Sequence, residues 1–104
     1  MALSATEKKH FRGIGHHLKP VVMVGGNGLS ETVLAELERA LEEHELIKVK
    51  VAAEDRDTRR ALVDELPARC GCEIVATIGN IALIYRAARK QNPKLSNLVR
   101  FSGS

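Results

Sequence analysis

The stretch that most constrains this chain is residues 21–30, Val-Val-Met-Val-Gly-Gly-Asn-Gly-Leu-Ser, where an apolar run passes into a glycine-rich turn. Four consecutive β-favouring residues predict a buried strand, and Pro20 marks its start. Because glycine has no Cβ, the turn can adopt positive φ and a ligand can approach its main chain closely. Ser30 is a good N-cap, so a helix is predicted to begin directly after it.

This predicted loop suits an anion, because it brings unpaired N–H groups to the positive end of a helix. It is not a Walker loop, since no Gly-Lys-Ser/Thr follows, and Glu31 stands where the dinucleotide fingerprint needs its last glycine. The remaining Gly-x-x-Gly spacing is the one that KH-type modules use to clamp a nucleic-acid backbone. The alternative is a plain turn that joins a strand to a helix. The loop residues are Gly25, Gly26, Asn27 and Gly28.

Charge is distributed unevenly along the 104 residues, although the net charge is only +3. Residues 1–20 hold four basic residues and one glutamate, residues 21–47 hold one arginine and six glutamates, and residues 74–104 hold five basic residues and no acidic one. The length predicts a single domain, and the 3% aromatic content predicts an aliphatic core. A surface with one basic side suits a polyanion that approaches from one direction.

The two cysteines, Cys70 and Cys72, are too few for a disulfide framework or a zinc site, so we expect reduced thiols and no bound metal. No run of 18 apolar residues occurs, and the first residues lack the pattern of a signal peptide. We therefore expect a cytoplasmic protein without membrane contact. No motif predicts a cofactor.

One helix is predicted before the glycine loop, and a second helix and a strand are predicted after it. A Ser-x-x-Glu capping box at Ser4 and apolar spacing predict a helix over about residues 5–18. A second helix over about 31–44 has an apolar face and an acidic outer face. Residues 46–52 alternate strictly, so Lys48 and Lys50 point away from the core. These lysines could contact successive phosphates, or they could protect an edge strand from aggregation.

In the second half of the sequence, a third helix is predicted over residues 58–70. We expect it to kink or to end early near Leu66, because Pro67 follows. Residues 73–78 and 81–86 flank Gly79-Asn80, which predicts a hairpin with a primed turn. Residues 87–104 are predicted to be a basic, flexible tail. A short amphipathic segment that docks on the body remains an alternative, formed by Leu95, Leu98, Val99 and Phe101.

These elements predict an α/β fold, a single two-layer domain of order α-β-α-β-α-β-β. Each strand-helix-strand step favours parallel strands, and the hairpin adds an antiparallel one. We therefore expect a four-stranded mixed sheet with its helices mainly on one face. The sequence does not determine the strand order.

Several segments resemble the bacterial YhbY family, the stand-alone CRM domains, over about residues 3–86. The similar segments are residues 18–22, 25–29, 34–41, 78–80, 83–86 and, most specifically, His44-Glu45-Leu46-Ile47-Lys48-Val49-Lys50. The resemblance implies a KH-like RNA-binding domain, similar in fold to the C-terminal domain of translation initiation factor three. It also implies association with precursors of the large ribosomal subunit. Asn80, Gly15 and Pro67 depart from the family pattern.

The predicted RNA contacts combine the glycine loop with basic side chains. The resemblance suggests Lys8, Lys19, Lys48, Lys50 and Arg86, and the polar side of the first helix adds Lys9 and Arg12. Residues 1–86 are taken as the RNA-binding domain and 87–104 as the tail. With few aromatic residues for stacking on bases, binding should follow RNA shape more than sequence.

The predicted function is therefore a non-catalytic, monomeric RNA-binding factor of ribosome assembly. One alternative is a protein adaptor on ribosomal particles, which would use the acidic second helix and the tail and could contact ribosomal proteins. Another is a nucleotide-binding enzyme with His10, His16, His17 or the carboxylates as catalysts. No nucleophile–base pair or metal-ligand spacing supports the enzyme.

Overall fold

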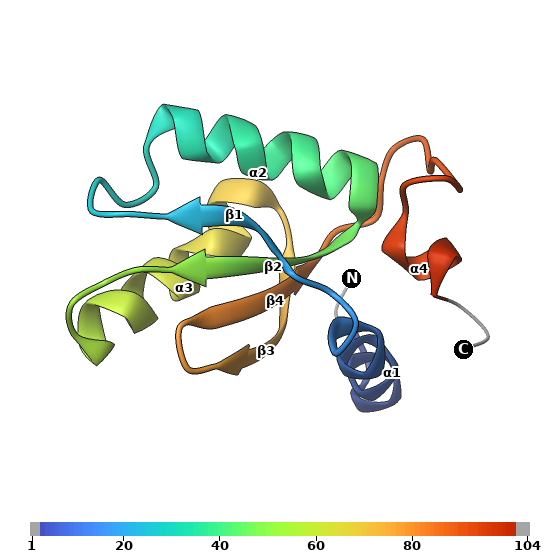
Figure 1. Cartoon of the computed structure of the whole chain (residues 1–104), viewed down its shortest axis with the longest axis horizontal. Coiled ribbons are helices and arrows are strands. Elements are labelled where there is room, and N and C mark those ends of the chain that lie inside the picture. The colour runs from blue at the N-terminus through green and yellow to red at the C-terminus, as the bar shows by residue number, and fades with distance from the viewer. Residues whose placement is uncertain (1–2, 102–104) are drawn as a thin grey trace.

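The computed structural model, which describes residues 3–101, contains four helices and four strands within that range (Figure 1). They are α1 (Ala5–Gly15), β1 (Pro20–Val24), α2 (Glu31–His44), β2 (Leu46–Val51), α3 (Arg56–Cys70), β3 (Glu73–Ile78), β4 (Ile81–Tyr85) and α4 (Asn97–Arg100). The predicted order of the first seven elements is confirmed, and α4 is added. None of these helices is long and apolar enough to cross a membrane.

The four strands form one mixed sheet in the order β1-β2-β4-β3. β1 and β2 are parallel, whereas β4 runs antiparallel to both β2 and β3. The long helices α2 and α3 pack on one side of the sheet, here called the helical face (Figure 1). α1 and α4 cover part of the other side, here called the open face. The predicted four-stranded mixed sheet is confirmed, with the two long helices on one face.

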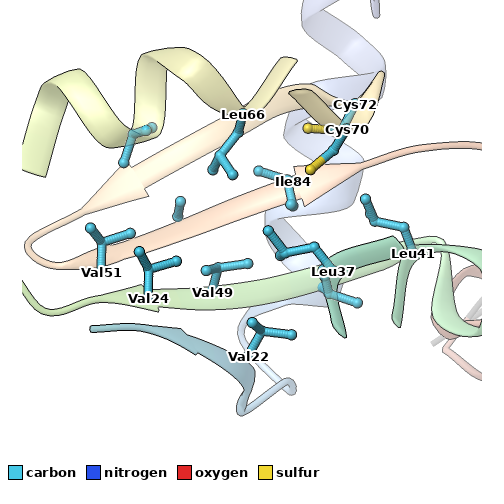
Figure 2. Close-up of a cluster of buried hydrophobic side chains, with 13 residues drawn as sticks. Val22, Val24, Leu37, Leu41, Val49, Val51, Leu66, Cys70, Cys72 and Ile84 are labelled. Atoms are coloured by element: carbon cyan, nitrogen blue, oxygen red, sulfur yellow. The ribbon is translucent and has the colours of Figure 1, made fainter. Parts of the chain in front are cut away.

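The main core lies between the helical face and the helices α2 and α3 (Figure 2). Alternation along β2 turns Ile47, Val49 and Val51 into this core, where each is at most 1% exposed. Leu37 and Leu41 of α2 meet them and are fully buried. Burial of each such side chain contributes about 1.5–3 kcal/mol. A smaller cluster on the open face packs Phe11 and Ile14 of α1 against Leu46, Val75 and Leu83.

α1 approaches the open face closely because Gly15 has no side chain. A Cβ at Gly15 would lie 2.8 Å from Cδ2 of Leu83, whose side chain is buried. The predicted capping box at Ser4 is present, with reciprocal bonds to Glu7. α1 ends at Gly15, three residues before the predicted end at 18. Gly15 therefore serves packing at a point where helix propensity alone would favour alanine.

The third helix was predicted over residues 58–70 with a kink or an early end near Leu66, and the structure confirms its extent without the early end. α3 continues to Cys70 and stops at Gly71, which has the left-handed conformation (φ 66°). The N–H of Gly71 donates to the carbonyl oxygen of Pro67 at 2.9 Å, so the last turn is closed. Proline removes one hydrogen bond near the helix end, and burial of Leu66 and Cys70 against the core offsets that loss.

The segment after Arg86, predicted as a flexible tail, lies against the body over residues 87–101, and residues 102–104 are outside the described range. Its anchor is Glu45, which is 3% exposed and has φ 62°. The Glu45 carboxylate accepts bonds from Ala88 N at 2.7 Å, Gln91 Nε2 at 2.6 Å and Ser96 Oγ at 2.7 Å. The alternative of a short docked segment is thus realised as α4, and Leu98 and Phe101 join the smaller cluster.

Candidate nucleic-acid interface

Lys48 and Lys50 lie on the open face in the middle of the sheet. β2 sits between β1 and β4, so the alternative that these lysines protect an edge strand is wrong. Lys50 pairs with Met23 of β1 on one side and with Ile81 of β4 on the other, and Ile81 pairs in turn with Ile78. Met23 and Ile78 are 58% and 69% exposed. The open face therefore presents a lysine within a row of uncovered apolar side chains.

α1 adds positive charge along the border of this face. Lys8, Arg12 and His16 are spaced by four residues, so they lie along one side of the helix. Arg12 and His16 line a hollow of about 70 Å³ together with Lys48, above a floor that includes Ile81 and Leu83. Lys9 is exposed on α1 and does not line that hollow. The structure thus brings Arg12 and Lys48 together, as the proposed basic face requires.

The glycine loop leaves β1 at the end of the sheet and leads into α2 (Figure 1). Only Gly28 needs to be glycine for its conformation, with φ 63°, and its N–H donates to the carbonyl oxygen of Gly25 at 3.0 Å. Gly25, Gly26 and Asn27 do not have positive φ, and a Cβ at either glycine would have no neighbour within 4 Å. Neither conformation nor packing explains these two glycines. Their effect is to leave the main chain open to close approach.

The hollow beside this loop is acidic, a feature that no sequence motif predicted. It has a volume of about 440 Å³, and its lining includes Glu54 and Asp55 but no lysine or arginine among the described residues. Asp55 caps α3, and hydrogen bonds from the main chain and hydroxyl of Thr58 lower the pKa of its carboxyl. Ionised carboxylates repel a phosphate. A phosphate is therefore disfavoured in the hollow beside Glu54 and Asp55.

The loop and the strand lysines are close enough to meet one ligand. Lys50 pairs with Met23, and Gly25 follows Met23 by two residues, about 7 Å along an extended chain. Lys48 lies a further two residues back along β2 on the same face. One strand of nucleic acid can thus pass over both lysines and reach the loop.

Arg86 does not belong to this basic face, contrary to the sequence-based expectation. Its side chain is only 18% exposed and pairs with Glu38 at 2.7 Å and Glu42 at 3.5 Å, both on α2. Its guanidinium also donates to the carbonyl oxygen of Cys70 at 3.2 Å. The hydrogen bond between Arg86 and Glu38 raises the pKa of Arg86 and lowers that of Glu38. The charge of Arg86 is therefore already compensated by α2.

Two further hollows are lined by basic residues. Lys19 is exposed before β1 and shares a hollow with Lys48 and with Arg100 of α4. Arg56, Arg59 and Arg60 line a hollow of about 470 Å³ between α3 and β3. The arginine cluster was visible in the sequence at the start of the third helix. The position of Arg100 was not, because it depends on the docking of α4.

The residues considered for catalysis do not converge in the structure. His16 lines the hollow with Lys48, whereas His17 stacks on Phe101 with ring centroids 5.8 Å apart. Burial and the neighbouring Cys70 raise the pKa of the Cys72 thiol to about 12, so this thiol stays protonated at neutral pH. Among residues 3–101, no three His, Cys, Asp or Glu side chains are grouped in a way that could hold a metal ion.

Comparison with known proteins identifies the family. Residues 3–86 match the sequence model of the CRS1 / YhbY (CRM) domain. The chain belongs to this family. It is 59% identical over 103 residues to a probable RNA-binding protein of Pseudomonas aeruginosa, and the match covers 99% of both chains. It is 47% identical to an RNA-binding protein of Haemophilus influenzae, over 89% of this chain and 94% of the relative.

The same CRM fold occurs in a solved solution structure of a Staphylococcus aureus protein whose description proposes RNA binding. The two share 29% sequence identity with a TM-score of 0.75, over 86% of this chain and 93% of the other. The family match ends at Arg86. The docked segment with α4 therefore lies outside the CRM domain as the family defines it, although the match to the Pseudomonas relative extends through it.

Proposed function

We propose that this CRM domain is a non-catalytic RNA-binding protein that uses its open face and glycine loop. The observation that carries the proposal is the position of Lys48 and Lys50 on a central strand, beside uncovered apolar side chains and next to the loop. The names of its relatives, which describe RNA binding, support the class of ligand. Its place in the cytoplasm and its action as a monomer are part of the same proposal.

Binding would begin with electrostatic attraction to the RNA backbone. Each phosphate neutralised by a lysine or arginine releases condensed counterions, so affinity falls steeply as salt rises. Lys48, Lys50 and Arg12 supply the charges, and the open main chain at Gly25 and Gly26 allows the sugar-phosphate backbone to come close. The helical face would be avoided, because the outer surface of α2 carries glutamates.

The apolar row on the open face gives bases a surface on which to lie. Met23, Ile81 and Ile78 lie across three strands on either side of Lys50. Aliphatic side chains exclude water from a base but offer neither the stacking of aromatic rings nor hydrogen bonds to base edges. Recognition should therefore depend on unpaired or distorted RNA more than on sequence.

The family resemblance suggests ribosomal RNA in precursors of the large subunit as the target, with ribosomal proteins as further partners. Exposed glutamates of α2 that take part in none of the ion pairs of the described residues, Glu31 and Glu36, would suit a basic ribosomal protein while the open face holds RNA. Sedimentation with ribosomal particles, with and without ribonuclease, would separate the two kinds of contact. Retention after ribonuclease treatment would support a protein contact.

The decisive experiment reverses the charge of the two strand lysines. The double variant Lys48→Glu/Lys50→Glu should bind a large-subunit RNA fragment at least about tenfold more weakly, with a salt slope lower by about 1.5, because two phosphate contacts are lost. The matched control is Lys90→Glu/Lys94→Glu, which makes the same change in net charge at exposed positions of the C-terminal segment. Equal weakening by both double variants would refute the proposed surface.

A further inference from the structure

A second basic hollow lies at the opposite end of β1 from the glycine loop. It has a volume of about 210 Å³ and is lined by the connection between α1 and β1, by β1 and β2, by the end of α2, and by α4 with the residue after it. Its lining includes three cationic side chains, Lys19, Lys48 and Arg100, and two histidines, His17 and His44. No carboxylate belongs to the lining among the residues that the structure describes. We call this hollow the α4 pocket.

The wall that α4 contributes is held in place by several independent contacts. Asn97, 6% exposed, donates from Nδ2 to the carbonyl oxygen of Leu46 at 2.7 Å, and Ser96 donates to Glu45. The Phe101 ring stacks on His17 with an interplanar angle of 8°. The Arg100 guanidinium lies 5.5 Å from the centroid of the Phe101 ring. The position of Arg100 beside the pocket is therefore preorganised by the fold.

Two carboxylates beside the pocket-lining residues, Glu43 and Glu45, already have partners within the chain. Glu43 lies 3.9 Å from Nε2 of His44 and is paired with Arg39 at 2.9 Å. Glu45 is buried and accepts bonds from the C-terminal segment. Within residues 3–101, no ion pair involves Lys19, Lys48 or Arg100. The three cations of the pocket are thus available to an external anion.

We infer that the α4 pocket is a second phosphate-binding site, which holds a backbone phosphate of the RNA bound on the open face. This inference rests on the proposed function and extends it. β1 runs from Pro20 beside the pocket to Val24 before the glycine loop, about 13 Å along an extended chain. β2 is parallel to β1, so Lys48 lies at the pocket and Lys50 nearer the loop. The RNA backbone would follow β1 from the pocket to the loop.

The side chains between the two sites fit this path. Val21 and Met23 are 52% and 58% exposed along β1, so bases can lie on them while phosphates reach the lysines of β2. The path also gives a role to residues beyond Arg86. The CRM domain as the family defines it supplies Lys19 and Lys48, but only the docked C-terminal segment supplies Arg100.

The first test compares two charge reversals in the same segment of the full chain. Arg100→Glu should weaken binding of a single-stranded RNA about fivefold or more and lower the salt slope by about 0.7, one phosphate contact on a single strand. Lys94→Glu changes charge equally but does not line the pocket, and its affinity should stay within about twofold. Lys19→Glu tests the pocket from the opposite wall without touching α4. Equal effects of Arg100→Glu and Lys94→Glu would overturn the inference.

The second test uses inorganic phosphate and does not depend on RNA. Titration followed by the ring NMR signals of His17 and His44 should give saturable shifts in the wild type and in Lys50→Glu, and these shifts should be lost in Lys19→Glu and Arg100→Glu. Shifts that are absent in the wild type, or that persist in both pocket variants, would overturn the site. Weaker RNA binding in Lys50→Glu with unchanged binding in both pocket variants would refute the pocket while leaving the proposed function intact. Absence of RNA binding in the wild type would refute the proposed function, and the phosphate titration would still decide whether the pocket holds an anion.

Discussion

The two faces of the sheet are formed by the same strands, but basic side chains are paired with carboxylates on one face and not on the other. On the helical face, Arg86 reaches α2 and is paired with Glu38 and Glu42. On the open face, Lys48 and Lys50 take part in no ion pair with any residue of the described range. A basic residue is therefore available to a ligand only where the opposing element brings no carboxylate, and this depends on packing.

The largest expected effect concerns Glu45, which attaches the C-terminal segment next to the open face. Glu45→Gln should lower the free energy of unfolding by about 2–3 kcal/mol, because a buried charged acceptor with several donors is lost. Denaturant unfolding would measure this change. If α4 stays docked and stability is unaffected, the anchoring role of Glu45 is disproved.

The same carboxylate predicts a dependence on pH. Burial acts to raise the pKa of Glu45, but hydrogen bonds from Gln91, Ala88 and Ser96 outweigh it, so the pKa lies below the usual 4.5. The stabilisation is therefore present above pH 4.5 and is lost as the pH falls through the lower folded-state pKa. In Glu45→Gln this part of the acid sensitivity should be missing, which unfolding curves between neutral pH and about pH 3 would reveal.

The variant Arg86→Met would test whether the charge of Arg86 stabilises the fold or binds RNA. The change removes the ion pairs to α2 and the bond to Cys70, so we expect a loss of about 1–2 kcal/mol, moderated by the partial exposure of Glu38. RNA affinity of the folded variant should change less than about twofold, in contrast to the lysine reversals. A large loss of RNA affinity without a loss of stability would show that Arg86 binds RNA and does not serve the fold.

Two glycines of the loop should respond differently to substitution. Gly28→Ala should cost about 1 kcal/mol of stability because φ is 63° at this position. Gly26→Leu should leave stability within about 0.5 kcal/mol, since a Cβ there meets nothing, yet it should weaken RNA binding about fivefold by blocking close approach. Thermal unfolding together with RNA titration checks both. Unchanged RNA affinity in Gly26→Leu would exclude the loop from the interface.

The smallest effect is expected at the acidic hollow beside the loop. Glu54→Gln removes an exposed carboxylate that is not the helix cap, so RNA should bind about twofold more tightly and with no loss of stability. Asp55→Asn is a useful comparison, because asparagine keeps the capping geometry while removing the second charge. Equal or weaker RNA affinity in both variants would mean that the RNA does not pass near this side of the loop.

Much of the fold follows from local pattern. The capping box at Ser4, the cap at Ser30 and the strict alternation of residues 46–52 predicted α1, α2 and β2 within a few residues. The sequence also predicted the third helix over residues 58–70. It could not decide how Pro67 affects this helix, because burial of the last turn depends on a sheet that the local sequence does not describe. The strand order was left open for the same reason, since β4 enters the middle of the sheet.

In the candidate site too, some features follow from local sequence and others depend on tertiary structure. By itself, the sequence determined that Lys48 and Lys50 share one side of a strand and that an open glycine turn follows β1, because side-chain direction and turn permissiveness are local properties of the backbone. Only the tertiary structure decided that Arg86 is neutralised by α2, that carboxylates flank the loop, and that α4 brings Arg100 beside Lys19. These relations join segments tens of residues apart, and they exist only once the strand order and the docking of Glu45 have brought those segments together.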